Sequence, residues 1–361
     1  MNDLKVVEFI KNNGLDALEK QFFIHVKRHG KYPNLVLLKY DQINSDFSQE
    51  MVRQCRGIIL DETNDWKVVC YSYCKFANYG ESYADKIDWE NANVLAKEDG
   101  SLCQLFFYDN KWHVATSGDP SAGGQVNGFD YTFSELFWKV WNELGYILPD
   151  KQDNNKCYSF ELLTPYNRIV VKHKVNRIVL HGIRNLSDLE QFLPNKINSN
   201  NWEIIKYFQI NSIEEAIDKA NNFNGLENEG FVIVDSVNFN RIKVKGKHYL
   251  TLAYLKESCG SSQRRLLELV RINEGVEFLT SFSEFSNDYY KIKFKYDILI
   301  KQIDSSYKMI EHISDRKIFA SLATKNKYSG LLFNMKDKKI NSFKEGLKDI
   351  NIKVLEEWLD L

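Results

Sequence analysis

The sequence predicts an α+β protein, with antiparallel sheets up to about residue 254 and an all-helical C-terminal region after it. Short runs of β-branched and aromatic residues recur between residues 35 and 245, as expected for strands. After Tyr249 the apolar spacing becomes helical almost to the end of the chain. This change near residues 250–255 indicates two domains, 1–254 and 255–361.

The elements follow from these patterns in chain order. Apolar spacing predicts short helices within residues 1–30 and further helices at 131–145, 187–192 and 212–222. Apolar runs predict strands at 35–40, 56–61, 67–73, 112–117, 157–163, 168–171, 177–182, 230–235 and 241–245. At the centre we expect a hairpin, in which the Asp99-Gly100 turn joins the run ending at Lys97 to the run 102–108. Beyond the boundary, helices are clearest at 262–272, 288–313 and 341–359.

The composition narrows the class of protein. With 361 residues, 43% of them hydrophobic and 14% aromatic, the chain is expected to fold around sizeable cores. The formal net charge of −1 gives no overall basic field. Residues 316–353 nevertheless carry ten basic and three acidic side chains, typical of a solvated helical face or of a phosphate-contacting one. The aromatic residues among them, Phe319, Tyr328 and Phe333, are candidates for stacking on nucleic-acid bases.

Cysteine spacing and hydropathy bear on location. None of the six cysteines forms a C-x-x-C pair, so we expect free thiols in a reducing compartment. The first residues lack the apolar core of a signal peptide, and no stretch approaches the ~20 apolar residues of a membrane span. We therefore expect a cytoplasmic protein that has no membrane partner.

Lys97, in Lys97-Glu98-Asp99-Gly100-Ser101, is the candidate nucleophile. It follows an apolar run, so its amine is expected at the lip of a sheet. Gly100 nearby would let a phosphate approach the backbone closely. The same four-residue pattern also occurs by chance in ordinary hairpins, so it needs support from the rest of the chain.

Support comes from charged residues placed on other predicted strands. Arg56 lies in Cys-Arg-Gly, Glu161 within the strand 157–163, and Glu229 just before the strand 230–235. Lys243 and Lys245 are two residues apart, and so share one face of their strand. Carboxylates within strands are costly to bury unless they are paired or bind a metal. An edge-strand ion pair would explain either glutamate alone, but it explains the whole ordered set poorly.

In this order the motifs resemble those of the covalent nucleotidyltransferases, most closely the phage-type RNA ligase 1 family of ATP-dependent RNA ligases. They stand here as Lys97-x-Asp-Gly, Phe160-Glu161, Glu229-Gly230 and Lys243-Val-Lys245, with Cys-Arg56-Gly upstream and 165–170 (PYNRIV) after Glu161. The resemblance covers roughly residues 35–250. It implies a nucleotidyltransferase domain (ATP-grasp-like ligase fold) followed by a helical domain that has a role in RNA binding.

The resemblance also implies an activity, in which AMP passes from ATP to a lysine and then to a 5′-phosphate on RNA. A 3′-hydroxyl then displaces AMP and seals the strand, as in repair of broken tRNA. The implied ligands are ATP and Mg²⁺, with Mn²⁺ as a substitute, and RNA with 5′-phosphate and 3′-hydroxyl ends. A polynucleotide end-healing kinase/phosphatase is a candidate partner.

The roles carried over by motif are the following. Lys97, Lys243 and Lys245 are the catalytic residues, and the two strand lysines, together with a magnesium ion, are expected to lower the pKa of Lys97. Glu229 and Asp99 are the expected metal ligands. The nucleotide would be bound by Arg56, Lys75, Phe76, Lys97, Gly100, Glu161, Glu229, Lys243 and Lys245, with Arg56 on the outgoing phosphates and Glu161 on the ribose.

Two positions depart from the family pattern. Ala77 replaces the second aromatic residue of Lys-Phe-Phe-Asn, and Ser117 stands where the phage enzyme has a lysine after the nucleophile. Both departures concern nucleotide and phosphate contacts. They leave open a non-catalytic RNA-binding relative as an alternative. A DNA ligase or a capping guanylyltransferase would use the same lysine chemistry and is the other alternative.

Overall fold

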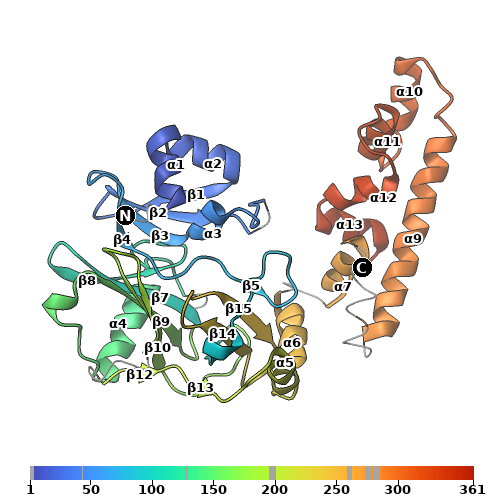
Figure 1. The fold of residues 1–361 in the computed structure, drawn as a ribbon. Helices are drawn as coiled ribbons and strands as arrows, with labels where there is room; N and C mark the ends of the chain where they lie inside the picture. Colours follow the sequence, from blue (N-terminus) through green and yellow to red (C-terminus); the bar gives the residue numbers. More distant parts are fainter. Residues whose placement is uncertain are drawn as a thin grey trace. The chain divides into compact units, whose positions relative to one another are not determined.

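The strand-forming runs of the first 250 residues assemble into three sheets, and each sheet is paired mainly in antiparallel fashion (Figure 1). The structure is a computed structural model that describes residues 4–42, 44–126, 129–194, 201–257, 262–272, 279 and 285–361. It divides into two units, residues 1–250 and 251–361. The observed boundary lies close to the one expected at 254/255, and the α+β fold class is confirmed.

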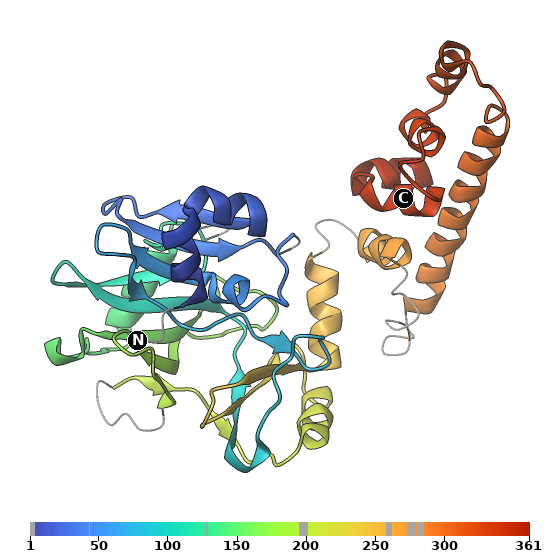
Figure 2. The same ribbon diagram turned by 45° about the horizontal axis from the view of Figure 1, so that its top comes forward.

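The first sheet has the strand order β1-β2-β3-β4. Helices α1 and α2 cover one of its faces (Figures 1 and 2), where Val6, Ile10 and Leu18 pack on the strands. Its other face packs against the second sheet through a small buried cluster that includes Leu37, Ile59 and Phe106. The elements are α1 (Lys5–Asn13), α2 (Leu15–Phe22), β1 (Ile24–Arg28), β2 (Leu35–Tyr40), α3 (Glu50–Gln54), β3 (Arg56–Asp61) and β4 (Lys67–Cys70).

The second sheet has the strand order β11-β10-β9-β7-β8, and β12 runs parallel to β10. Helix α4 packs on it, and this helix begins at a capping box in which Thr132 and Glu135 bond to each other's backbone. The elements are β7 (Ser101–Tyr108), β8 (Lys111–Thr116), α4 (Phe133–Glu143), η2 (Lys151–Asp153), β9 (Lys156–Leu163), β10 (Arg177–Asn185), β11 (Gln191–Phe192) and β12 (Glu203–Ile204).

The third sheet has the strand order β13-β6-β14-β15-β5. Its outer face packs on α5, and Leu95 and Val234 join it to Leu163 and Val179 of the second sheet. The elements are β5 (Ala77–Asn78), η1 (Trp89–Asn91), β6 (Ala92–Lys97), β13 (Tyr207–Phe208), α5 (Ile213–Asn221), β14 (Gly230–Asp235) and β15 (Arg241–Lys245). The chain then continues into α6 (Lys247–Glu257).

Several sequence-based expectations are wrong in detail. Residues 187–192 form a turn and the short strand β11 instead of a helix, and residues 168–171 form no strand. Within the first 30 residues, β1 follows the two helices and was not predicted. The central hairpin is also absent, because β6 and β7 belong to different sheets. The Asp99-Gly100 turn therefore carries the chain from one sheet to the next.

The second unit is helical, as expected, and has a hydrophobic core of its own. In both ribbon views α10 to α13 lie along one side of α9 (Figures 1 and 2). Phe319 and Tyr328 are buried in this core, and Phe333 is partly buried against it, which contradicts their expected stacking on bases. The elements are α7 (Ser262–Ile272), α9 (Ser286–Lys308), α10 (Arg316–Ala323), α11 (Ser329–Lys336), α12 (Phe343–Gly346), η5 (Leu347–Asp349) and α13 (Ile352–Leu359).

We expect the aromatic cluster under the second sheet to dominate the stability of the first unit. Phe160 is fully buried and its ring contacts those of Phe137, Trp141 and Trp202. Phe160→Ala should therefore cost about 3–5 kcal/mol, because it removes a ring from a packed site. Urea unfolding followed by tryptophan fluorescence measures the loss. Val175→Ala, at an exposed position, is the control, and a loss below about 1 kcal/mol for Phe160→Ala would contradict this assignment of the core.

Candidate active site

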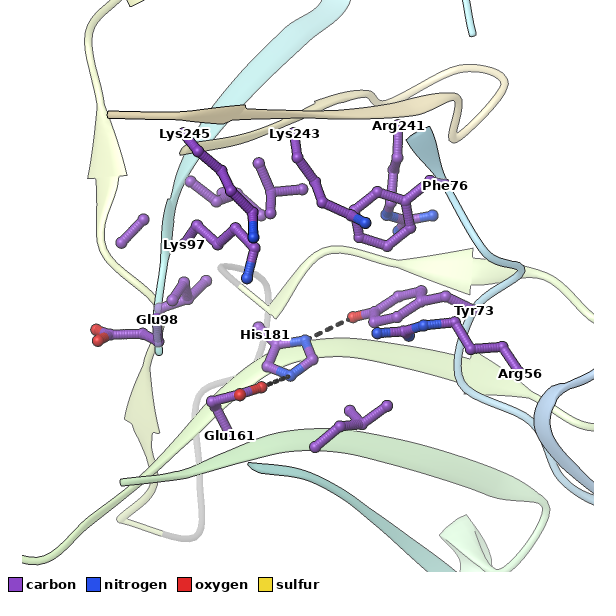
Figure 3. Close-up of a pocket in the computed structure, with 15 residues that line it drawn as sticks. Arg56, Tyr73, Phe76, Lys97, Glu98, Glu161, His181, Arg241, Lys243 and Lys245 are labelled. Carbon is purple, nitrogen blue, oxygen red and sulfur yellow. Dashed lines mark hydrogen bonds and ion pairs between the residues drawn. The ribbon is translucent and has the colours of Figure 1, made fainter. Parts of the chain in front are cut away.

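A cavity of about 180 Å³ lies where the second and third sheets face each other, and most of the sequence-predicted site residues surround it (Figure 3). Lys243 and Lys245 project from β15 toward it, while Glu161 and His181 reach it from β9 and β10. Lys97 enters from the end of β6. The charged and aromatic side chains that line the cavity are Arg56, Tyr73, Phe76, Lys97, Glu98, Glu161, His181, Arg241, Lys243 and Lys245.

The crossing between the two sheets places Lys97 at this cavity. Lys97 is the last residue of β6, and Ser101 already begins β7 in the other sheet. Gly100 makes the crossing possible, because a Cβ there would collide with the Leu162 carbonyl and the Leu163 side chain. Its N–H instead donates to Glu161 Oε1 at 3.2 Å. Gly100 thus sets the backbone path beside the cavity without lining it.

Asp99 has a structural role in the same crossing. Its carboxylate is buried and accepts hydrogen bonds from the backbone N–H groups of Val170 and Val171, both at 2.7 Å. The Tyr249 hydroxyl donates to its other oxygen at 2.6 Å. These bonds tie the turn to the segment after Glu161 and to the start of α6. The structure thereby contradicts the expectation that Asp99 is a metal ligand, because its oxygens serve the fold and it does not line the cavity.

Glu229 is held between two lysines on neighbouring strands. Its oxygens lie 2.7 Å from Lys97 Nζ and 2.9 Å from Lys245 Nζ, and only 2% of its side chain is exposed. Strand register explains this, because Gly230 pairs with Lys97 on one side and with Lys245 on the other. Gly230 has φ of 149°, and a Cβ there would collide with the Val244 carbonyl. The Glu-Gly motif therefore requires glycine in order to hold the three strands this close.

The carboxylates keep the nucleophile candidate protonated in this structure. Burial lowers the pKa of Lys97, but the charges of Glu229 and Glu161 outweigh it, and the net pKa is raised. The two strand lysines alone therefore do not lower the pKa of Lys97 in the nucleotide-free arrangement, where Lys245 is paired with the same carboxylate. The expected lowering with a magnesium ion present stays a prediction. The Lys97 amine must lose its proton before it can act as a nucleophile.

The surroundings of Lys243 lower its pKa, whereas those of Lys97 raise the pKa of that lysine. Burial, followed by repulsion from Arg56 and Lys97, lowers its pKa to about 6. Its Nζ lies 4.9 Å from the centre of the Phe76 ring, and the Arg56 guanidinium lies 5.6 Å from the same ring. Among the described residues, no carboxylate lies within ion-pair distance of Lys243 or Arg56, and Arg56 Nη1 is buried without a hydrogen-bond partner. These two cations are therefore poised for an anion.

Two side chains that sequence reasoning missed, Tyr73 and His181, border Glu161; His181 Nε2 lies at ion-pair distance from the carboxylate and forms no hydrogen bond with it. Tyr73 Oη lies 2.9 Å from His181 Nδ1, and His181 Nε2 lies 3.5 Å from Glu161 Oε2 (Figure 3). Arg241 stacks on Tyr73 with its guanidinium 4.4 Å from the ring centre. Two sequence features could have indicated these residues. Arg241 shares a face of its strand with Lys243 and Lys245, and His181 interrupts the apolar run of β10.

The remaining predicted contacts lie beside the cavity. Lys75 is mostly buried, and its Nζ lies 4.2 Å from the centre of the Phe47 ring and 4.8 Å from that of Tyr40. Ala77 is buried in β5, where it pairs with Ile242 of β15. The small side chain at this departure from the family pattern therefore packs within the third sheet.

Comparison with known proteins identifies the family. A family model described as RNA ligase, of the phage T4 RNA ligase 1 type, matches residues 54–249, which include every predicted site residue. The chain belongs to this family. The expected resemblance to the phage-type RNA ligase 1 family is thus confirmed.

Individual relatives agree with this family. The chain is 25% identical to an RNA ligase of Rhodothermus phage RM378 over 340 residues, covering 77% of this chain and 76% of the phage protein. It is 27% identical over 299 residues to a putative bifunctional polynucleotide kinase/RNA ligase of Autographa californica nuclear polyhedrosis virus. That match covers 77% of this chain but only 42% of the viral protein. A solved archaeal ATP-dependent RNA ligase aligns over 90% of this chain and 89% of its own, with 11% identity and a TM-score of 0.47.

The described cysteines and helices bear on the expected free thiols and on the expected absence of a membrane span. Cys55, Cys70, Cys74, Cys103 and Cys157 are free thiols, and Cys259 lies outside the described residues. No helix in the described part of the chain is both long and apolar enough to cross a bilayer.

The two lysines of β15 should affect stability in opposite directions. Unfolded Lys243 has an ordinary pKa of 10.5, whereas the folded value is about 6, so between these pH values the unfolded chain binds more protons. The stability of the wild type therefore rises with pH across that window. Lys243→Met should raise the unfolding temperature by about 2–4 °C or more at pH 7, and this gain should shrink as the pH rises.

Lys245→Met is the matched comparison, and it should lower the unfolding temperature because buried Glu229 loses one of its two cations. Thermal unfolding of both variants between pH 6.5 and 9.5 measures these effects. A destabilising Lys243→Met, or a gain that does not change with pH, would contradict the assignment of Lys243 as an amine without an ion-pair partner whose pKa is lowered on folding.

Proposed function

We propose that this protein is an ATP-dependent RNA ligase that seals RNA with 5′-phosphate and 3′-hydroxyl ends through lysyl-AMP and RNA-adenylate intermediates. One observation carries the proposal. A lysine at the end of a strand faces the same cavity as two strand lysines and an arginine, while a carboxylate it contacts is fixed by strand register. This is the arrangement that phosphoryl transfer to an amine requires.

In the first step the neutral amine of Lys97 attacks the α-phosphate of ATP. A nitrogen–phosphorus bond forms, the bond to the bridging oxygen breaks, and pyrophosphate leaves with that electron pair. Lys97 has to give its proton to water beforehand, and the neutral amine is favoured only if its ion pair with Glu229 opens when the nucleotide binds. Lys243, Lys245 and Arg56 then offset the negative charge on the transferring and departing phosphates.

The Glu161 side of the cavity suits the sugar. Its carboxylate is an acceptor for ribose hydroxyls, and the bond to the Gly100 N–H together with His181 fixes its orientation. His181 and Tyr73 are in this view positioning residues, because they act through Glu161.

A divalent cation fits only part of the predicted ligand set. Within the described residues no three metal-ligating side chains converge, and Asp99 is committed to the backbone. Glu229 is the remaining predicted ligand, but it too lies outside the cavity lining and both its oxygens are paired with lysines. It would hold Mg²⁺ or Mn²⁺ only once its ion pair with Lys97 opens, with water and nucleotide oxygens completing the coordination. When bound, the ion would neutralise phosphate charge.

Labelling separates this proposal from its alternatives. Wild-type protein incubated with α-labelled ATP and Mg²⁺ should retain label after denaturation, and Lys97→Ala should abolish the label because the phosphoramide bond cannot form. Lys206→Ala, at a lysine that lies outside the cavity lining, is the control that should label normally.

Each other outcome points to a specific alternative. Label from GTP in place of ATP would support a capping guanylyltransferase. Sealing of DNA ends in preference to RNA ends would support a DNA ligase. Folded protein that is not already adenylated and that takes no label would support a non-catalytic RNA-binding relative.

RNA contact by the second unit is a further part of this proposal. The lysines at 317, 325 and 327 are exposed, and no acidic partner is seen for them among the described residues. Replacing all three by glutamate in the full chain should weaken RNA binding and lower the slope of log K against log salt by about 2, since each phosphate contact contributes roughly 0.7. Self-adenylation should stay within about twofold, since these residues are outside the first unit.

The matched control is a triple replacement of Lys291, Lys293 and Lys308 by glutamate, which makes the same charge change at lysines already paired to aspartates. Equal loss of binding in both triple variants would show that only net charge matters. Equal loss of self-adenylation and of sealing would contradict a separate RNA-binding role.

The substrate of the proposed activity must carry a 5′-phosphate and a 3′-hydroxyl. Breaks that end otherwise need a kinase and a phosphatase first, so an end-healing enzyme is the proposed partner and damaged tRNA a proposed source of ends. The viral relative carries both a kinase and a ligase in its name, and this chain matches 42% of its length.

A further inference from the structure

The positive charge at the cavity continues past Arg56 into a second group of buried cations. Lys39 of β2 is partly buried, and its pKa is lowered to about 8 by burial, followed by repulsion from Arg56 and Lys75. Lys39 and Lys75 contact the same ring, since their Nζ atoms lie 4.5 and 4.8 Å from the centre of Tyr40. The four basic side chains Lys243, Arg56, Lys75 and Lys39 thus form one continuous cluster, defined here as the cation cluster. The pKa values of its three lysines are lowered, so a bound anion would be needed to favour their charged forms.

The side chain of Lys39 extends to Ser117, the position at which a serine departs from the lysine of the family pattern. Its Nζ donates to Ser117 Oγ at 3.2 Å. Ser117 is brought there by a close backbone contact, because Gly57, next to Arg56, has φ of 82° and a Cβ on it would lie 2.6 Å from the Ser117 Cα. Where the phage enzyme has a lysine side chain, this chain therefore has an ammonium that arrives from a different strand.

The described residues do not neutralise the cation cluster. None of its four members forms an ion pair with a described carboxylate; the charge of Glu81 acts to raise the pKa of Lys75, but burial outweighs it. Glu81 bonds to the backbone and side chain of Asn78, and Asp119 pairs with Lys27 and with its own turn. Buried and unpaired cations are costly, so the fold itself gives no reason to gather four of them. A ligand with several negative charges in a row would satisfy them.

We propose that Lys39 binds the terminal phosphates of the nucleoside triphosphate and of the pyrophosphate product, supplying from β2 the cation that Ser117 lacks. This inference rests on the proposed function, since it takes the triphosphate to extend from Lys97 past Lys243 and Arg56 along the cation cluster. It assigns Lys39 to the adenylation step. RNA-adenylate carries no triphosphate, so the later sealing step would not use Lys39 in this way.

The test compares Lys39→Met with the double variant Lys39→Met/Ser117→Lys and with Lys27→Met. Lys27 lies on the neighbouring strand β1 and is paired with Asp119, so its replacement is the matched control. Self-adenylation is measured against ATP concentration, its reversal against pyrophosphate concentration, and sealing with pre-adenylated RNA. Lys39→Met should raise the half-saturating ATP and pyrophosphate concentrations by about 10-fold to 100-fold, the expected loss for one charge-assisted contact.

Two further results are expected from the same variants. The loss in sealing of pre-adenylated RNA should be much smaller than the loss in self-adenylation. The added lysine in the double variant should restore at least part of the affinity for ATP and pyrophosphate. Lys39→Met should also be at least as stable as the wild type, because it removes a buried cation, and Lys39→Gln is the second variant should Lys39→Met fail to fold.

The possible failures are distinct. If the wild type takes no label from ATP, the proposed function itself fails. If the wild type labels but Lys39→Met, or Lys39→Gln in its place, keeps the wild-type dependence on ATP and pyrophosphate, Lys39 does not bind the phosphates. Equal losses in self-adenylation and in sealing of pre-adenylated RNA would assign Lys39 a structural role and also overturn the inference.

Discussion

The buried carboxylate of Glu229 is the interaction on which the rest of the site depends. It has almost no contact with water and is satisfied by two lysines, each from a strand that flanks β14. Each lysine is in place only when the three strands pair in this register, so register and electrostatics specify each other. A slip of one residue in either pairing would turn a lysine away and leave the carboxylate without a partner. The motif residues are therefore part of the fold as well as of the chemistry.

Next to the paired Glu229 carboxylate lie basic side chains for which the fold provides no carboxylate partner among the described residues. Lys97 and Lys245 are paired, whereas Lys243 and Arg56 have no carboxylate partner among the described residues. Hydrophobic contacts between the second and third sheets, through Leu95, Leu163 and Val179, must hold these cations together against their repulsion. The arrangement fits a site whose missing partner is a polyanionic substrate, because such a ligand would stabilise the folded protein as it binds.

Local sequence patterns predicted the strands well and the connections between them poorly. The bounds of β2, β3, β14 and β15 agree with their apolar runs, because side-chain alternation is a local property. The Asp99-Gly100 turn was misread as a hairpin, because whether two strands pair depends on which sheet each one joins. The motif residues could be chosen from their order in the chain. The structural role of Asp99, the place of His181 and the burial of the aromatic residues in the second unit depend instead on contacts between distant segments. Such contacts have no local signature.

Ser117 shows why a departure from a motif has to be judged in three dimensions. In the sequence it is a lost lysine, and with Ala77 it favoured a relative without catalysis. In the structure an ammonium lies at its hydroxyl, delivered by Lys39 from a strand some 78 positions earlier, and Ala77 packs within a sheet. A charge near a phosphate site acts through its position and solvation, and the strand that carries it is immaterial. An ammonium thus stands beside Ser117 although this position has no lysine, so the serine by itself does not argue for a non-catalytic protein.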